Sequence, residues 1–526
     1  MRTLDSVLRP LTRLAIAALL AAAPLSASAA VRQFTTVAIT GEDAPGAAID
    51  QRFIQLNAPT INNAGRVAFT ATLSGPNVST LNDRGVWSNT TGPLELIARE
   101  GDNAPDMPAN VVFRNFNNPA INDAGHISIR GEVTGPGITS LNDLAIWSDT
   151  GAGLSRVIQE RQAPPGVSGG ASFLTFGGPN LTATGRTTLI GTMIGGPVDT
   201  TNNVGLWSTR AGDLSLIARQ GQHAPGLDAG VIFKTLQDPG INNHGAFSIR
   251  PQLSGPGIDS TNDQGIWAER DGGLQLIVRE SDAAPGLPDG TRFTTMFPQT
   301  MNDSGRIAFR GRTSGPNDGI WSDGRGALAP VALAGDEVPN VGLDFTSFFN
   351  PVLNVDGDTA FVARFGSGSG LFSEGGDGLH LVAGTGAPAP GVTDGALFGN
   401  FANPTFPANF VLNAEGRIAF LSPLLNTPNS QGLFVEIDGA LTLAVQKGDL
   451  IEVAPGDFRT VSFLDFEGVS ANQGARASAF NDLGQLAFQA EFTDGSEGVF
   501  IFNTIPEPAT AALALIGLAV ARRRRR

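Results

Sequence analysis

The sequence contains no cysteine and no tyrosine, and its only lysines are Lys234 and Lys447. Without cysteine there is no disulfide framework, no thiol nucleophile and no thiolate ligand for a metal. Export remains compatible with this absence, because a chain of 526 residues can bury a core large enough to be stable without disulfides. The sequence therefore excludes thiol chemistry and leaves the compartment to be decided by other features.

Positive charge is also scarce once the two ends of the chain are set aside. The formal net charge of the whole chain is −15, but residues 31–505 carry 26 basic and 47 acidic residues, a net charge of −21. Phosphate backbones and anionic lipid headgroups repel such a body. We therefore expect no nucleic-acid partner.

Glycine and proline are abundant, with 67 and 34 residues, while hydrophobic residues make up 41% of the chain. The apolar content is too high for a disordered chain, and the turn-forming residues favour many short strands joined by tight turns. The length exceeds what one ordinary hydrophobic core organises, so we expect several domains or one array of repeats.

The first 30 residues have the three parts of a secretory signal peptide. The basic part contains Arg2, Arg9 and Arg13. An unbroken apolar run follows at residues 14–23, too short for an N-terminal membrane anchor, which is the alternative. The small residues Ala27, Ala29 and Ala30 then form the site at which we expect a signal peptidase to cleave.

The other end of the chain, residues 504–526, has Pro506, Glu507 and Pro508, then an apolar stretch at 509–521 and five arginines. A helix over these thirteen apolar residues is about 20 Å long, against about 30 Å for the hydrocarbon core, so it is marginal as a permanent span. The arginines would remain cytoplasmic and leave the body outside.

The order of tripeptide, short apolar helix and arginine run resembles the PEP-CTERM sorting signal of exosortase-bearing Gram-negative bacteria. The resemblance implies that an exosortase, a membrane-embedded protease-like enzyme, recognises Pro506, Glu507 and Pro508 and removes the tail. The precursor would be anchored transiently in the inner membrane, and the body would then reach the cell surface or the extracellular matrix. A plain tail anchor is the alternative.

Between the two ends, at 31–503, the pattern Asn-x-x-Gly-x-x-Ala-Phe occurs eight times in full or degenerate form. Its glycines are Gly65, Gly125, Gly185, Gly245, Gly305, Gly357, Gly416 and Gly484. A second aromatic follows at the same interval, at Trp87, Trp147, Trp207, Trp267, Trp321, Phe372, Phe434 and Phe500. We expect these aromatics to occupy equivalent packed positions between the units.

Each unit predicts four short strands, which in the first copy are 52–56, 66–73, 85–88 and 94–99. Four strands in about 60 residues fit a β-propeller blade, and the repeat resembles TolB-type propeller repeats. It also resembles the tandem-repeat proteins named for their NxxGxxAF motif, which have no established activity. The predicted fold is therefore all-β, an eight-bladed β-propeller, with a β-solenoid or tandem β-sandwiches as alternatives.

The ends of the repeat array favour a closed ring. Residues 34–46 resemble a fourth strand and its tail, whereas the last unit has a third strand at 498–502 and no fourth. The strand missing at one end is present at the other, so we expect Phe34 to Thr40 to pair with this last strand. An open solenoid would need capping units and has no reason for this offset.

No compact catalytic or metal-binding motif occurs in the sequence. His126, His223 and His244 are scattered among turns, where they are typical surface residues. Aspartates recur at two places in the repeat, and oxygen ligands of this kind could hold calcium. They are Asp83, Asp143, Asp263 and Asp318 in one set and Asp102, Asp282, Asp336 and Asp449 in the other. The alternative, which we prefer, is that they cap turns, so no cofactor is expected.

Two classes of function remain. The first is a non-enzymatic surface or matrix module that presents a propeller face to polysaccharide or protein. The second is a secreted propeller enzyme, a polysaccharide lyase or glycosidase, that uses carboxylates in its channel. An enzyme breaks the symmetry of its repeats at a few strand ends, whereas these units differ mostly by decay of apolar positions, which favours the module.

The tail makes the first testable prediction. In cells that possess the sorting enzyme, mass spectrometry of the mature protein should find a C-terminus upstream of the arginine run. Glu507→Ala keeps the apolar helix and removes the recognition residue, so the variant should keep its tail. A wild-type protein that still ends at Arg526 would contradict the prediction.

Overall fold

The computed structural model describes residues 34–503 except 210–211, 238, 316–317, 376–377, 393–394, 403–408, 438 and 469–477. Both predicted processing sites lie outside the described residues, namely Ala27, Ala29, Ala30, Pro506, Glu507 and Pro508. Every regular element in the described part is a β-strand, and none of it forms an apolar helix of membrane-spanning length.

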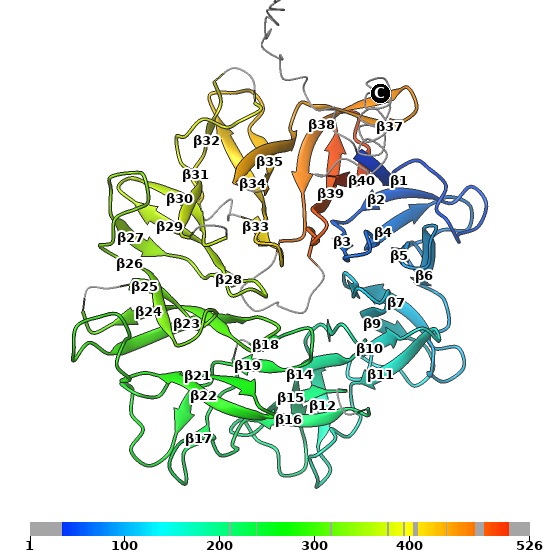
Figure 1. The fold of residues 1–526 in the computed structure, drawn as a ribbon. Helices are drawn as coiled ribbons and strands as arrows, with labels where there is room; N and C mark the ends of the chain where they lie inside the picture. The colour runs from blue at the N-terminus through cyan, green and yellow to red at the C-terminus, as the bar shows by residue number, and fades with distance from the viewer. Residues whose placement is uncertain are drawn as a thin grey trace, which may run out of the picture. The chain divides into compact units, whose positions relative to one another are not determined.

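The described strands form eight small antiparallel sheets arranged in a ring, which confirms the predicted eight-bladed β-propeller (Figure 1). Blades 1 to 3 contain β2 (Arg52–Leu56), β3 (Thr60–Ile61), β4 (Val67–Ser74), β5 (Arg84–Ser88) and β6 (Glu95–Arg99); β7 (Val112–Phe116), β8 (Ala120–Ile121), β9 (Ile127–Thr134), β10 (Leu144–Asp149) and β11 (Leu154–Gln159); and β12 (Ser172–Phe176), β13 (Asn180–Leu181), β14 (Thr187–Ile194), β15 (Val204–Ser208) and β16 (Ser215–Arg219). Blades 4 and 5 contain β17 (Ile232–Phe233), β18 (Gly240–Ile241), β19 (Phe247–Ile249), β20 (Leu253–Ser254), β21 (Gly265–Arg270) and β22 (Gly273–Arg279); and β23 (Phe293–Met301), β24 (Ile307–Thr313), β25 (Asp318–Ser322) and β26 (Ala329–Leu333). Blades 6 and 7 contain β27 (Phe345–Phe348), β28 (Val352–Leu353), β29 (Thr359–Phe365), β30 (Gly368–Ser373) and β31 (His380–Gly384); and β32 (Leu397–Phe398), β33 (Asn409–Leu412), β34 (Ile418–Leu425), β35 (Gln431–Ile437) and β36 (Ala440–Gln446). Blade 8 contains β37 (Leu450–Ala454), β38 (Asp457–Asp465), β39 (Gln485–Phe492), β40 (Glu497–Asn503) and β1 (Phe34–Ile39).

The four strands predicted for the first unit are present with bounds that agree within one residue, but the first of them is interrupted. In blade 1, β2 and β3 both pair with β4, and residues 57–59 separate them. Pro59 ends this interruption and has no backbone N–H to donate to the sheet. Blade 4 is interrupted once more at Pro251, between β19 and β20, for the same reason.

Strand β37 was not predicted. It pairs with β38 as a hairpin, at a place where blade 2 has only an isolated bridge between Asn103 and Val112. The segment 450–454 is Leu-Ile-Glu-Val-Ala and is followed by Pro455 and Gly456, so it combines alternating β-forming residues with a tight turn.

The repeated motif folds as a tight turn between the first and second strands of each blade. In blade 1 the backbone N–H of Gly65 donates to the carbonyl of Asn62 at 3.0 Å. The motif glycines of all eight blades have φ between 72° and 91°, a conformation that side chains disfavour. The turn therefore requires glycine, which explains why this residue recurs even in the degenerate copies.

The second aromatic of each unit is buried between blades, as predicted. All five tryptophans, Phe372, Phe434 and Phe500 are 0% exposed. In blade 3 the ring of Trp207 meets that of Phe173 edge-on, with centroids 4.7 Å apart, and its Nε1–H donates to the carbonyl of Pro165 at 3.0 Å. The other four tryptophans also donate to a proline carbonyl, which accounts for the recurring Ala-Pro tails.

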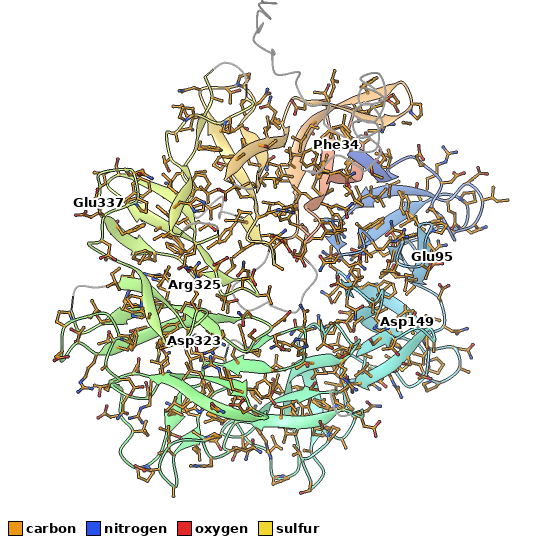
Figure 2. The ribbon with its side chains drawn as sticks, viewed as in Figure 1. Phe34, Glu95, Asp149, Asp323, Arg325 and Glu337 are labelled. Carbon is orange, nitrogen blue, oxygen red and sulfur yellow. The ribbon has the colours of Figure 1, made fainter. Side chains whose placement is uncertain are left out.

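The ring closes through its two ends. Strand β1 pairs with β40 from Phe34 opposite Phe502 to Ile39 opposite Gly498, so both ends of the chain complete blade 8. The side chain of Phe34, labelled in Figure 2, packs edge-on against Phe488 at 5.9 Å. The predicted pairing is confirmed, and the two strands run antiparallel.

Deleting residues 31–43 from the mature protein should lower the melting temperature and promote self-association, because it exposes the edge of β40 and opens the ring. As a control, deleting 256–261 from a loop of blade 4 should change the melting temperature little, because the corresponding loop of blade 5 is naturally six residues shorter. Calorimetry and light scattering would measure both effects. An N-terminal deletion that melts like the parent and stays monomeric would argue against closure as a source of stability.

Candidate functional site

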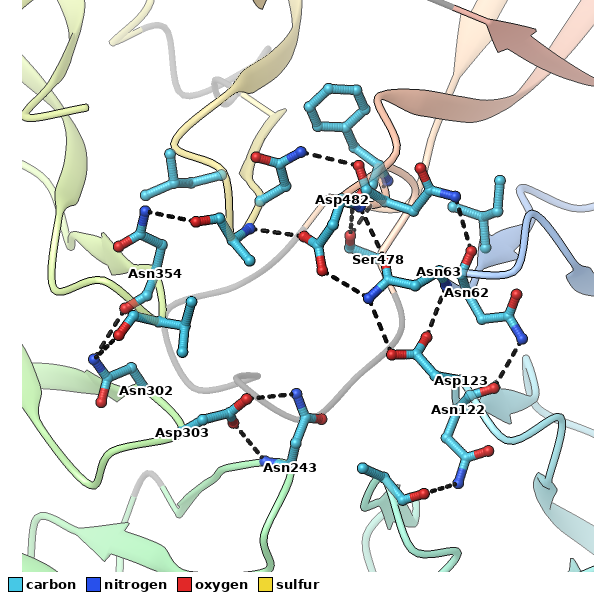
Figure 3. Close-up of a pocket in the computed structure, with 18 of the residues that line it drawn as sticks. Asn62, Asn63, Asn122, Asp123, Asn243, Asn302, Asp303, Asn354, Ser478 and Asp482 are labelled. Atoms are coloured by element: carbon cyan, nitrogen blue, oxygen red, sulfur yellow. Dashed lines mark hydrogen bonds between the residues drawn. The ribbon is translucent and has the colours of Figure 1, made fainter. Parts of the chain in front are cut away.

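The motif turns surround a central opening with a volume of about 230 Å³ (Figure 3). Its wall is made largely of the first two residues of each turn. The first residue of the turn is threonine in blade 3, Thr182, and asparagine in the other seven blades: Asn62, Asn122, Asn242, Asn302, Asn354, Asn413 and Asn481. Of these eight residues, all but Thr182 and Asn242 line the opening. Those asparagines are all buried, between 1% and 6% exposed.

Each of these asparagines links its blade to the next. The Nδ2 of Asn62 donates to the carbonyl of Asn122 at 2.8 Å, and the Nδ2 of Asn481 donates back to the carbonyl of Asn62 at 2.9 Å. The same bond to the following turn occurs from the other asparagines, at 2.8 to 3.4 Å. In blade 3, where threonine replaces asparagine, the backbone N–H of Ala183 donates to Asn243 instead. The links therefore run around the whole ring.

The same side chain also holds its own turn. The Oδ1 of Asn62 accepts the backbone N–H groups of Ala64 at 3.0 Å and Arg66 at 2.8 Å. Only an amide has an acceptor and a donor at opposite corners of one planar group, and aspartate would lack the donor. The first position of the motif is thus explained by two simultaneous hydrogen-bonding roles.

The second residue of the turn adds a further set of links at the opening. The Oδ1 of Asp123 accepts the backbone N–H of Asn63 at 2.7 Å, and the Nδ2 of Asn63 donates to carboxylates on both sides, Asp123 at 3.0 Å and Asp482 at 2.7 Å. Asn243 and Asp303 repeat the same pair between blades 4 and 5 (Figure 3). Amide and carboxylate oxygens therefore face the centre of the ring.

A larger cavity of about 470 Å³ lies beside this opening, and Ser478 lines both. Its wall comes from the interrupted first strands of blades 1, 2 and 3, at 57–60, 116–120 and 178–179, and from Glu467 and Gly468 of blade 8. Arg84 and Arg130 complete it. Sequence reasoning missed both this cavity and the asparagine ring; the asparagine that recurs in seven of the eight units was the available signal for the ring.

The aspartates proposed as calcium ligands serve other contacts. The carboxylates of Asp282, Asp336 and Asp449 each accept the backbone N–H three residues earlier, at 2.7 to 3.0 Å. Asp318 forms two hydrogen bonds with the guanidinium of Arg310, at 2.9 and 2.6 Å. Across the part of the chain that the structure describes, no three carboxylate or histidine side chains gather as a metal site. The turn-capping interpretation accounts for Asp282, Asp336 and Asp449 among the four tail aspartates.

Two buried glutamates have perturbed acidity. Burial is the main cause that raises the pKa of Glu100 to about 7, and hydrogen bonding with Asp83 adds to it. Burial likewise raises the pKa of Glu280 to about 7, with the nearby negative charge of Asp263 as the next cause. Both carboxyls accept the backbone N–H at the start of the third strand of their own blade, at 3.2 and 3.1 Å. In blade 3, Gln220 makes the same bond at 3.2 Å, so the position is structural.

The histidines remain dispersed. His223 and His244 are exposed, and the Nδ1 of His126 contacts the amide of Asn122 within its own turn. His380, on β31, forms a 3.0 Å contact with Glu436 of the next blade, and this hydrogen bond is the main cause that raises the pKa of His380. His244 is an exposed turn residue as predicted, whereas His126 is half-buried and the exposed His223 forms an isolated β-bridge with Ile232.

The chain matches a family described as a family of unknown function (DUF7453) over residues 25–158, 131–271 and 240–512. No curated protein matches it. Among solved structures, an uncomplexed acylaminoacyl peptidase of Pyrococcus horikoshii is 12% identical, with a TM-score of 0.36 over 84% of this chain and 58% of the peptidase. A Trypanosoma rangeli sialidase is 10% identical, with a TM-score of 0.27 over 77% of this chain and 72% of the sialidase. The chain thus spans little more than half of the peptidase, and these likenesses say nothing about activity.

The asparagine ring makes a stability prediction. Asn302→Asp keeps the turn acceptor but removes the donor to the carbonyl of Asn354, and it places a negative charge against that carbonyl. Leaving buried groups unpaired costs about 1–3 kcal/mol, and more for a charge, so the urea midpoint should fall clearly. Asn302→Thr reproduces the residue that blade 3 has at Thr182, and it should cost less because it adds no charge. Equal midpoints for the two variants would contradict this account.

The glutamates make a prediction about pH. A carboxyl whose folded pKa is raised stabilises the fold fully below its unfolded pKa of 4.5, and this contribution is lost as the pH rises through about 7. The double variant Glu100→Gln and Glu280→Gln keeps the acceptor, as Gln220 does, but cannot titrate. Its melting temperature should equal that of the wild type near pH 4.5 and exceed it at pH 8. Parallel melting curves at all pH values would show that these carboxyls do not couple to folding.

Proposed function

The chain belongs to the family of unknown function DUF7453, and we propose that its propeller is an exported, non-enzymatic module of the cell surface or extracellular matrix. In this proposal the module binds saccharide at its central opening and in the cavity beside it. The signal peptidase and the exosortase are its partners during export, and a surface polysaccharide is its partner afterwards.

The observation that carries the proposal is that the polar side chains of the repeat bind to its own turns and to the neighbouring blades. The amide of Asn62 and its equivalents is committed to the turn and to the neighbouring blade. The carboxylates of the tails are committed to turns. A repeat whose polar groups hold the ring together is a scaffold, and the amides and carboxylates at its opening can exchange hydrogen bonds with sugar hydroxyls.

The predicted location of the protein outside the cell supports the same function. A secretory signal at 1–30 and a sorting tail at 504–526 would deliver the body to a surface that is rich in polysaccharide. The net charge of −21 on the body disfavours nucleic acids and anionic membranes as ligands.

One observation favours the alternative, a secreted enzyme that cleaves polysaccharide. Glu100 and Asp83 are a carboxyl pair, and the pKa of Glu100, about 7, is in the range that suits a general acid. However, Glu100 is only 3% exposed, and its equivalents include Gln220 and Thr385, which cannot donate a proton in this way. We therefore prefer the binding module.

A saccharide array followed by affinity electrophoresis in polysaccharide gels tests the proposal. The purified protein should be retarded by at least one polymer and leave its chain length unchanged after long incubation. Asn63→Ala, at the opening, should reduce the retardation, while His223→Ala on an exposed tail should not. Shortening of the polymer, or no retardation by any saccharide, would contradict the proposal.

A further inference from the structure

The cavity of about 470 Å³ beside the opening differs from the rest of the protein in its charge. Two of the residues that line it are the half-buried arginines Arg84 and Arg130, and among the described residues of the wall Glu467 is the one carboxylate. The volume lies within the roughly 300–1,000 Å³ of pockets that hold small ligands. In a body of net charge −21, a cavity with an excess of guanidinium groups is an unusual local environment.

Both guanidinium groups are held in place by neutral acceptors. The Nη1 of Arg84 donates to the Oδ1 of Asn115 at 2.9 Å, and the Nη1 of Arg130 donates to the Oδ1 of Asn117 at 2.9 Å. An amide acceptor orients a guanidinium but does not neutralise it. In addition, no described residue accepts a hydrogen bond from the buried Nε–H of Arg130.

Blade 5 also has an arginine at the position of Arg130, and there the positive charge of the arginine is paired within the blade. Arg310 is the equivalent of Arg130 of blade 2, and Asp318 is the equivalent of Leu144 of the same blade. There the carboxylate of Asp318 pairs with both ends of the guanidinium, at 2.9 and 2.6 Å. Arg130 lacks this partner within its own blade, because Leu144 stands where blade 5 has its aspartate.

Two acidic groups lie near these arginines and only partly offset their positive charge. Glu100 and Glu160 lie close to Arg84 and Arg130 respectively, and burial raises the pKa of both carboxyls, that of Glu100 to about 7. Near neutral pH Glu100 is therefore incompletely ionised. A planar carboxylate from a ligand would meet two oriented guanidinium groups, the arrangement that favours charge-assisted, bidentate hydrogen bonds.

We propose that this cavity binds the carboxylate of an acidic sugar, a uronate residue of a polysaccharide, through Arg84 and Arg130. The inference rests on the proposed saccharide-binding function and adds its substrate class. Asn117 and Asn118 are exposed along the same wall and supply amide groups for the sugar hydroxyls. The pair of guanidinium groups selects the acidic residue, and the amides select the sugar.

Titration calorimetry of the full-length protein tests the proposal with three probes: a galacturonate trisaccharide, its carboxyl-reduced neutral counterpart and a sulfated oligosaccharide of equal charge. We expect the uronate to bind at least 10-fold more tightly than either of the others. Arg130→Gln should weaken uronate binding at least 10-fold and so remove most of the preference for the uronate over its neutral counterpart. Arg310→Gln, at the equivalent position of blade 5, is the matched control and should leave both affinities unchanged.

Glu467→Gln provides a second variant, and it should tighten uronate binding severalfold because it removes a carboxylate from the wall. Equal affinity for the uronate and its neutral counterpart, with no effect of Arg130→Gln, would overturn this inference and leave the proposed function standing. Tighter binding of the sulfated probe would also overturn it, in favour of a sulfate site. Failure of all saccharides to bind would overturn both.

Discussion

The hydrogen bond from one asparagine side chain to the backbone of the next turn is the interaction on which the ring depends. Apolar contacts between blades are non-directional, so by themselves they tolerate small rotations of one blade against the next. Here the Nδ2 of Asn62 fixes the turn of blade 2 at 2.8 Å, and the Nδ2 of Asn481 fixes that of blade 1 at 2.9 Å. Because these groups are buried, an unpaired amide or carbonyl would be costly, and the turns are therefore held in one register.

Packing and closure build on this central ring. Farther from the centre, the indole of each tryptophan donates to a proline carbonyl of the preceding tail, so the blades are also linked across their apolar interface. Ion pairs add to this between blades 4, 5 and 6, where Asp323 pairs with Arg270 and Arg325 pairs with Asp358 (Figure 2). The pairing of β1 with β40 then removes the free sheet edge that an open array would leave.

Some positions of the repeat are the same from unit to unit and others differ, and this difference bears on function. Positions that hold the ring recur from unit to unit, as the motif glycines and the buried aromatics do. Positions around the larger cavity vary more: the place of Arg130 is taken by Thr70 in blade 1, Ile190 in blade 3, Arg250 in blade 4 and Arg310, paired with Asp318, in blade 5. A ligand can be distinguished only where the units differ, so the asymmetric part of the wall is the part that can recognise one.

The sequence by itself determined the number of blades, their strands and the way the ring closes, because these follow from periodicity and from turn chemistry that acts within a few residues. The spacing of Gly65 and its equivalents predicted the turns, and the unmatched strand at Phe34 predicted its partner at Phe502. Only the tertiary structure decided that Asn62 reaches the next blade, that Trp87 meets the carbonyl of Pro45, and that Arg84 and Arg130 share one cavity. These contacts join residues about 40 to 60 positions apart, or more than 400 across the closure, and local pattern carries no information on distances that ring geometry sets.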